Sequence, residues 1–128
     1  MNINIVIHIY SLIASAVGCN FLIDLISNTQ KSFFIEVEFP NRTKSELFHM
    51  MKNYETKQLR VIDDCCNCEP TIVNTYADMG NGKGEQRWTT SSVLDGIGIL
   101  SYGVSDDLQP RMQMRIGVAC GFGECGRG

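Results

Sequence analysis

Six cysteines are the residues of this chain with the most definite chemistry. They are Cys19, Cys65, Cys66, Cys68, Cys120 and Cys125. Thiols grouped in this way form disulfides in an oxidising compartment or bind zinc as thiolates in a reducing one. The Cys65-x-x-Cys68 spacing suits zinc, and the longer gap from Cys120 to Cys125 suits it less. In an exported chain disulfides are the default, and bridges between the two clusters would close a loop of about 50 residues, worth roughly 3–4 kcal/mol.

The sequence leaves the pairing of these cysteines open. Adjacent Cys65 and Cys66 should bond to different partners, because a bridge between neighbours is strained. If Cys19 stays in the mature chain, all the cysteines can pair internally. If processing removes Cys19, one thiol is left free or bonds to a second chain, which would make an oligomer.

Paired carboxylates are the next candidates for chemistry. Asp63-Asp64 and Asp106-Asp107 fall in loops beside expected strands. Loop aspartates at one end of a β-sandwich can bind calcium, which takes oxygen ligands. We expect no cofactor, with calcium at these aspartates as the alternative. His49 is the only histidine beyond the first eighteen residues. No motif places a nucleophile beside it, and we expect no enzyme.

Residues 1–18 are nearly all apolar and carry no charge, although no Lys or Arg precedes the apolar run. Two triplets of small residues, 14–16 and 16–18, suit signal peptidase. The sequence therefore predicts a signal peptide over 1–18, a single extracellular domain over 19–128, and no membrane span after processing. The alternatives are a buried N-terminal strand or helix, a membrane anchor, or a lipid attached to Cys19.

Charge is spread along the chain, with a formal net charge of −3 and no basic run. This pattern excludes nucleic acid as an expected partner. Asn41-Arg42-Thr43 is an acceptor sequence for N-glycosylation, at an expected turn where a glycan can project into water.

Alternation of apolar and polar residues predicts several short strands. They cover residues 32–40, 58–62, 71–77, 87–92, 93–104 and 111–120. Thr43 to Glu46 matches a capping box, and the apolar spacing after it predicts one short helix over 44–54. The glycines of Gly80-x-Gly82-x-Gly84 predict a hairpin loop. The expected fold is mainly β: a small antiparallel β-sandwich or sheet with one short helix, stapled by disulfides.

The glycine-rich loop 79–87 is the best candidate for a binding surface, because aromatic residues on loops tend to anchor contacts. Its candidate residues are Lys83, Arg87 and Trp88, although a core position is the stronger expectation for Trp88. We expect a secreted domain that binds an extracellular protein or a glycan. The alternatives are a matrix or coat component cross-linked by cysteine, and a calcium-dependent binder of lipid or glycan.

Two short motifs carry a resemblance to a known family. The run from Cys65 to Val73, Cys-Cys-Asn-Cys-Glu-Pro-Thr-Ile-Val, and the triplet Val118-Ala119-Cys120 resemble the ends of small secreted nematode domains of the six-cysteine (C6) type. The resemblance spans residues 65–125 and implies an extracellular, disulfide-bonded domain. Those domains carry further cysteines in the middle, whereas this chain has none between Cys68 and Cys120.

Overall fold

The computed structural model describes residues 18–126, which form a mainly β fold of seven strands. These are β1 (Cys19–Ser27), β2 (Phe33–Glu38), β3 (Phe48–Met50), β4 (Thr56–Asp63), β5 (Thr71–Asp78), β6 (Lys83–Val104) and β7 (Pro110–Gly123). Within this part of the chain no helix is long and apolar enough to cross a membrane. The predicted signal peptide lies outside the described residues, apart from Gly18.

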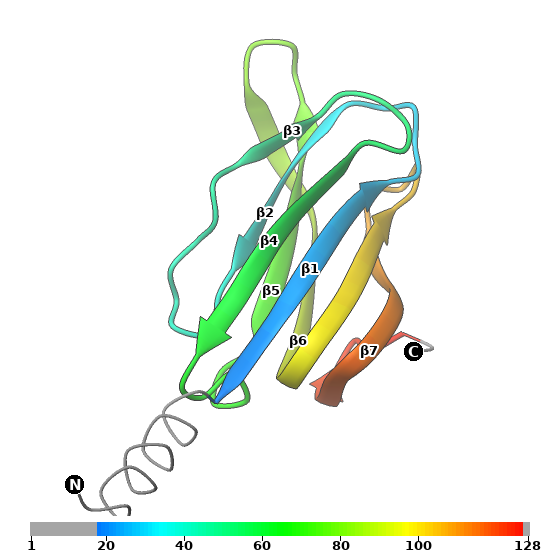
Figure 1. Ribbon diagram of the computed structural model, residues 1–128. Coiled ribbons are helices and arrows are strands. Elements are labelled where there is room, and N and C mark those ends of the chain that lie inside the picture. Colours follow the sequence, from blue (N-terminus) through cyan, green and yellow to red (C-terminus); the bar gives the residue numbers. More distant parts are fainter. Residues whose placement is uncertain (1–17, 127–128) are drawn as a thin grey trace, which may run out of the picture.

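The strands form two layers joined by the long strand β6 (Figure 1). The first part of β6, residues 83–92, pairs with β5, which continues the layer through β2 to β3. The second part, residues 92–104, pairs with β7 on one side and from Ile97 with β1 on the other, and β1 leads to β4. We call these the back layer (β3-β2-β5-β6) and the front layer (β4-β1-β6-β7).

The core lies between the two layers. Strand β1 shows why: Phe21, Ile23 and Leu25 are fully buried, whereas the residues between them are only half-buried. The back layer supplies Phe33 and Ile35, which are also fully buried. Successive side chains of a strand point to opposite faces, so this period of two fixes which face of each layer is inside.

Most of the predicted strands are confirmed. Residues 32–40 contain β2, 58–62 lie in β4, 71–77 in β5 and 111–120 in β7. The two strands expected over 87–104 are one continuous strand, β6, and the glycines before it form the expected hairpin turn. The expectation of a purely antiparallel sheet was incomplete, because β1 and β6 run parallel.

The predicted helix over 44–54 is wrong. Lys44 forms a bridge with Glu38, and β3 pairs with the edge of β2 instead. Thr43 does not cap a helix; its backbone N–H and hydroxyl both donate to Asn41. Phe48 and Met50 also fit a period of two, and pairing with an available strand edge outweighed a weak local preference for helix.

All six cysteines form disulfides within the chain. The bridges are Cys19–Cys66, Cys65–Cys68 and Cys120–Cys125. The adjacent pair bonds to different partners, as predicted, but the expected bridges between the two clusters are wrong. Two strands, β1 and β6, separate β4 from β7, which puts the clusters about 14 Å apart at ordinary strand spacing. A disulfide joins Cα atoms only about 4–7 Å apart.

Cys19 is part of the folded domain, because it opens β1 and its sulfur is bonded to Cys66. This bond leaves no thiol for a lipid at Cys19. The Cys65–Cys68 bridge takes up the two remaining thiols of the first cluster, so no thiolate is left there for zinc. The prediction of a disulfide-stapled β domain therefore holds, with a different set of bridges from the one expected.

Candidate interaction surfaces

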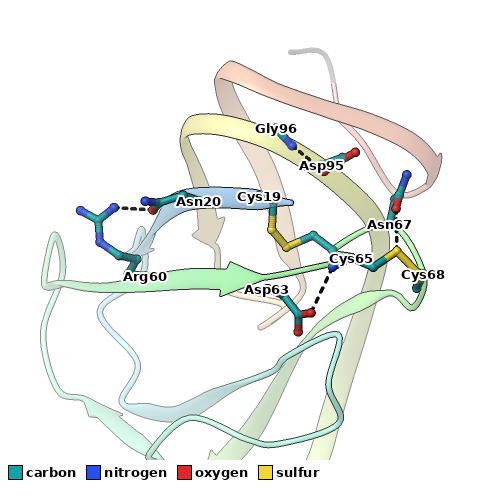
Figure 2. The surroundings of a disulfide bond; sticks show 10 residues. Cys19, Asn20, Arg60, Asp63, Cys65, Asn67, Cys68, Asp95 and Gly96 are labelled. Carbon is teal, nitrogen blue, oxygen red and sulfur yellow. Dashed lines mark hydrogen bonds between the residues drawn. A yellow bond between two sulfur atoms is a disulfide. The ribbon is translucent and has the colours of Figure 1, made fainter. Parts of the chain in front are cut away.

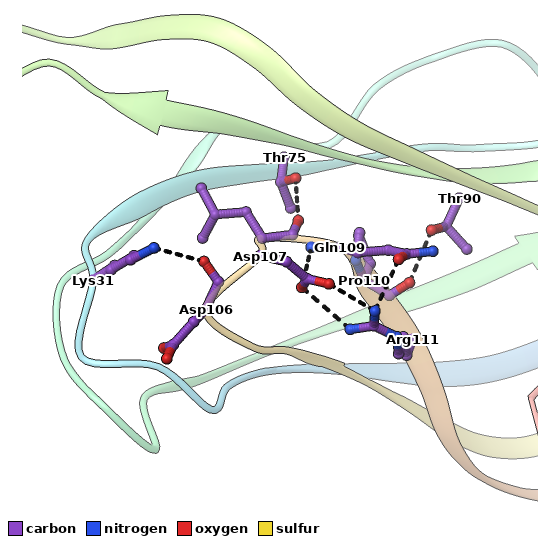
Figure 3. A network of polar contacts seen from close by, with 9 residues as sticks. Lys31, Thr75, Thr90, Asp106, Asp107, Gln109, Pro110 and Arg111 are labelled. Atoms are coloured by element: carbon purple, nitrogen blue, oxygen red, sulfur yellow. Dashed lines mark hydrogen bonds and ion pairs between the residues drawn. The ribbon is translucent and has the colours of Figure 1, made fainter.

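The turn between β6 and β7 ties the front layer to the back layer (Figure 3). Thr75 of β5 donates its hydroxyl to the Leu108 carbonyl at 2.6 Å, and Thr90 of β6 donates to the Pro110 carbonyl at 2.8 Å. Both threonines are buried, so these bonds form away from competing water. The turn is therefore held in a fixed position, and it forms one wall of a surface groove.

This groove, of about 360 Å³, lies between that turn and the β5–β6 hairpin. It is lined by Lys31, Ser32, Ala77, Asp78, Arg87, Asp106 and Leu108. Lys31 donates to the Asp106 carbonyl, and Thr29 donates to the Asp106 carboxylate. The groove therefore holds cations and carboxylates in comparable number, which does not select a ligand of one charge.

The three predicted binding residues lie on one hairpin but do not share a face. Trp88 is opposite Thr75, on the inner side, and is 43% exposed. Arg87 is the extra residue of a β-bulge beside it and lines the groove. Lys83 lies over the ring of Tyr76, at 4.3 Å from its centre, on the outer side of the back layer. The role of these residues in binding stays a prediction.

The two aspartate pairs predicted as a calcium site lie at opposite ends of the front layer. Asp63 is paired with Cys19 at one end of β1, whereas Asp106 follows Val104, which is paired with Ser27 at the other end. The length of β1 separates them by about 26 Å, so one ion cannot contact both pairs. Asp107 is bound by Arg111, whose guanidinium lowers the pKa of that carboxyl. Among residues 18–126, no three His, Cys, Asp or Glu side chains are grouped to hold a metal.

A buried carboxylate, Glu36, lies on the outer side of the back layer and is only 5% exposed. Tyr76 donates its hydroxyl to Glu36 at 2.5 Å, Asn74 donates at 3.3 Å, and the Lys44 ammonium is 3.6 Å away. Burial raises the pKa of Glu36, but these donors and the Lys44 charge outweigh it, so the net pKa is lowered. Burial, and then the Glu36 contact, raise the pKa of Tyr76 to about 12. The group is internally satisfied and acts as a structural clamp between β2 and β5.

His49 lies next to this clamp on β3. Its ring stacks on Phe34, with centroids 4.2 Å apart, and its Nε2 is 2.6 Å from the Asp78 carboxylate. The backbone N–H of Gly80, and then His49, lower the pKa of Asp78 to about 2. The stacked and hydrogen-bonded imidazole links β3 to the β5–β6 hairpin.

The outer side of the front layer carries an exposed apolar surface that we call the isoleucine face. Its residues are Leu22, Ile62, Ile97, Ile99 and Ile116. Leu22 is opposite Ile99, and Ile99 is opposite Ile116, so these three form one row across β1, β6 and β7. Ile97 is 70% exposed and Ile116 is 63% exposed. Directly opposed residues share a face, so the side chains are continuous across the strands.

Polar residues on the isoleucine face are paired with each other (Figure 2). Arg60 of β4 donates to Asn20 of β1 at 2.5 Å. Gln58, two residues away on the same face of β4, donates to Asp24 of β1 at 2.8 Å. Each pair joins β4 to β1, since the partners are opposite or diagonal neighbours. The polar groups are therefore already engaged, and what remains at the centre is aliphatic surface.

Sequence reasoning missed the isoleucine face. Ile97 and Ile99 alternate along β6 and were expected to belong to a strand, where such residues usually face a core. The available signal was that the alternate positions that follow them, Leu100 and Tyr102, are also apolar, and these two side chains fill the inner side. A strand with apolar residues on both faces needs a second cover, either another layer or a partner.

In comparisons with known proteins, no protein-family model and no curated protein matches the chain. The resemblance to nematode C6-type domains thus stays a prediction from the two motifs that carry it.

Proposed function

We propose that this chain is a secreted domain that binds another extracellular protein through the isoleucine face. The three internal disulfides support an oxidising location, because such bridges persist in secreted proteins and are rare in the cytosol. The observation that carries the binding proposal is the aliphatic row of half-buried Leu22 and Ile99 and exposed Ile116 across β1, β6 and β7. Exposed Ile62 and Ile97 flank this row on β4 and β6. Contiguous apolar patches on the surface of a folded domain mark interaction sites.

The chemistry of this face favours a protein over a glycan. A sugar is recognised through hydrogen bonds as well as apolar contact, and the nearby donors and acceptors of Asn20, Arg60 and Asp24 are engaged with neighbours. We therefore expect the partner protein to present a flat surface that is aliphatic or aromatic at its centre, with polar groups only at its rim.

Two alternative functions fit the bonded cysteines and the positions of the aspartate pairs less well. A matrix component cross-linked through an odd cysteine needs a free thiol, and all the cysteines are bonded internally. A calcium-dependent binder with both aspartate pairs in one site conflicts with their positions at opposite ends of β1.

Replacing Ile97 and Ile116 by Arg is expected to weaken binding to the extracellular partner by about 100-fold or more, because charge would be buried unpaired at the contact. The unfolding temperature should hardly change, since both side chains are exposed. The measurement is binding of the wild type and of the Ile97→Arg/Ile116→Arg variant to an array of purified extracellular domains, with a glycan array in parallel.

A Trp88→Ala variant is the matched control, because it alters the hairpin site and leaves the isoleucine face intact. We expect it to keep the same partner. Loss of that partner in Trp88→Ala but not in the isoleucine variant would move the site to the hairpin. Binding on the glycan array alone, or no binding on either array, would contradict the proposal.

A further inference from the structure

We propose that Asn41 carries an N-linked glycan whose first sugar packs against Phe39, so that the glycan stabilises the domain and covers the free edge of β4. The sugar would occupy the seam groove, which lies between β4 and the turn that follows β2. Its lining residues are Phe39, Asn41, Thr43, Arg60, Val61, Ile62 and Asp63. The proposal rests on the extracellular location proposed above.

The chain from Phe39 to Thr43 forms a tight five-residue turn. Arg42 donates its backbone N–H to the Phe39 carbonyl at 2.8 Å, and Phe39 donates its own to the Thr43 carbonyl at 2.8 Å. Arg42 has a φ of 70°, the left-handed conformation of a bulge at the end of a type I turn. Phe39, Asn41 and Thr43 all line the same groove. The aromatic ring and the glycosylation site are therefore held side by side.

The Asn41 amide is oriented for modification. Its Oδ1 accepts hydrogen bonds from the Thr43 backbone N–H at 3.0 Å and from the Thr43 hydroxyl at 2.6 Å. Only the amide oxygen can accept, so these bonds leave the amide nitrogen, which takes the sugar, pointing away from Thr43. Asn41 is exposed, and a transferase can reach it.

The seam groove suits the first sugar of an N-glycan, N-acetylglucosamine. Its volume of about 320 Å³ is within the range of small-ligand pockets, roughly 300–1,000 Å³. One side of Phe39 packs against the hydrophobic core, while the ring also lines the groove. The apolar face of the sugar can cover this ring and remove it from water. Asp63 at the opposite wall binds the Cys65 N–H through one carboxylate oxygen, and its other oxygen can accept from the hydroxyl or acetamido groups.

A glycan in this position also covers a strand edge. Strand β4 ends the front layer and pairs only with β1 within residues 18–126. In Figure 1 the chain that follows β2 runs beside this end of β4 without joining it as a strand. An uncovered edge pairs readily with other chains and leads to aggregation. The glycan would also mark one border of the isoleucine face, because Ile62 belongs to both surfaces.

Loss of the glycan in the Asn41→Gln variant is expected to lower the unfolding temperature by roughly 3–8 °C. The full chain is secreted from a eukaryotic host that adds uniform high-mannose glycans, and mass spectrometry confirms occupancy. An endoglycosidase that leaves one N-acetylglucosamine should preserve most of the wild-type unfolding temperature, because the first sugar makes the contact. A Phe39→Leu change keeps an apolar side chain but removes the ring, so the difference between trimmed and unglycosylated forms should nearly vanish.

A second acceptor site provides the matched control. Lys83→Thr in the Asn41→Gln background makes Asn81 an acceptor on the exposed β5–β6 turn, with Met79 in place of an aromatic two residues before it. A glycan there should leave the unfolding temperature within about 1 °C of its enzymatically deglycosylated form.

The outcomes separate this inference from the proposed function. A secreted protein with Asn41 unmodified, or modified with no gain in unfolding temperature, overturns the inference alone. A full gain that survives Phe39→Leu overturns the contact with the ring. A chain retained in the cell with free thiols overturns the inference and the extracellular location together.

Discussion

Replacing Cys19 and Cys66 together by Ala is expected to lower the free energy of unfolding by about 4 kcal/mol. The bridge joins residues 47 apart, so it restricts the unfolded chain more than either of the other bridges. The matched control is the Cys120→Ala/Cys125→Ala pair, whose bridge spans only 5 residues and should cost about 2 kcal/mol. Both losses are read from urea unfolding curves under non-reducing conditions.

The expected order of these losses is specific to the observed bridges. A loss of about 4 kcal/mol is a large share of the stability of a small domain, about 5–15 kcal/mol, so this variant should unfold at much lower urea. Equal losses for the two pairs, or a larger one at Cys120–Cys125, would mean that the long-range bridge does not join Cys19 to Cys66.

The second large effect is expected at the Glu36 clamp. Replacing Tyr76 by Phe removes the hydroxyl that donates to Glu36, and this should cost about 2 kcal/mol at pH 7, because a buried carboxylate loses a donor. Tyr54→Phe is the control, since Tyr54 is 76% exposed and its change should cost less than about 0.5 kcal/mol.

The pH dependence of that loss identifies the carboxylate. The pKa of Glu36 is lowered in the folded protein, so its contribution is present above the ordinary value of 4.5 and is lost as the pH falls through the folded pKa. The difference between wild type and Tyr76→Phe should therefore shrink in acid. A difference that stays constant from pH 7 to about pH 3 would contradict the clamp.

The same stability measurements, extended to alkaline pH, test the environment of the Tyr76 hydroxyl. The pKa of Tyr76 is raised to about 12 from an ordinary value of 10.0, so the unfolded state loses its proton first and the wild type loses stability above about pH 10. Tyr76→Phe should lose less over this range. Burial also raises the pKa of Tyr102 to about 12, so part of the alkaline decline should remain.

The sequence predicted those strands in which one face is apolar and the other polar, such as β2 and β7. It did not predict β1, because Leu22 and Ile26 make its outer face apolar too and continue the apolar run that precedes it. The parallel pairing of β1 with β6 joins residues far apart in the sequence, and local alternation carries no information about such contacts. The same continuous apolar character hid the isoleucine face.

The predictions of a helix and of bridges between the two cysteine clusters were wrong for related reasons. Residues 44–54 fit a period near four as well as a period of two, and the free edge of β2 decided between them. Cysteine spacing identified two clusters, but only the strand order shows that β1 and β6 lie between β4 and β7. The acceptor sequence at Asn41 was visible from the start. Its position beside Phe39 and the edge of β4 depends on how the turn folds.

The central claim, an exported domain closed by its own three disulfides, is tested most directly by a peptide map of the secreted protein. The full chain is expressed in a eukaryotic host, recovered from the medium and digested with trypsin without reduction. We expect the peptide that ends at Lys31 to be joined to peptide 61–83, and peptide 116–127 to carry its bridge internally. A link between peptides 61–83 and 116–127, or a chain that stays in the cell with free thiols, would contradict the account.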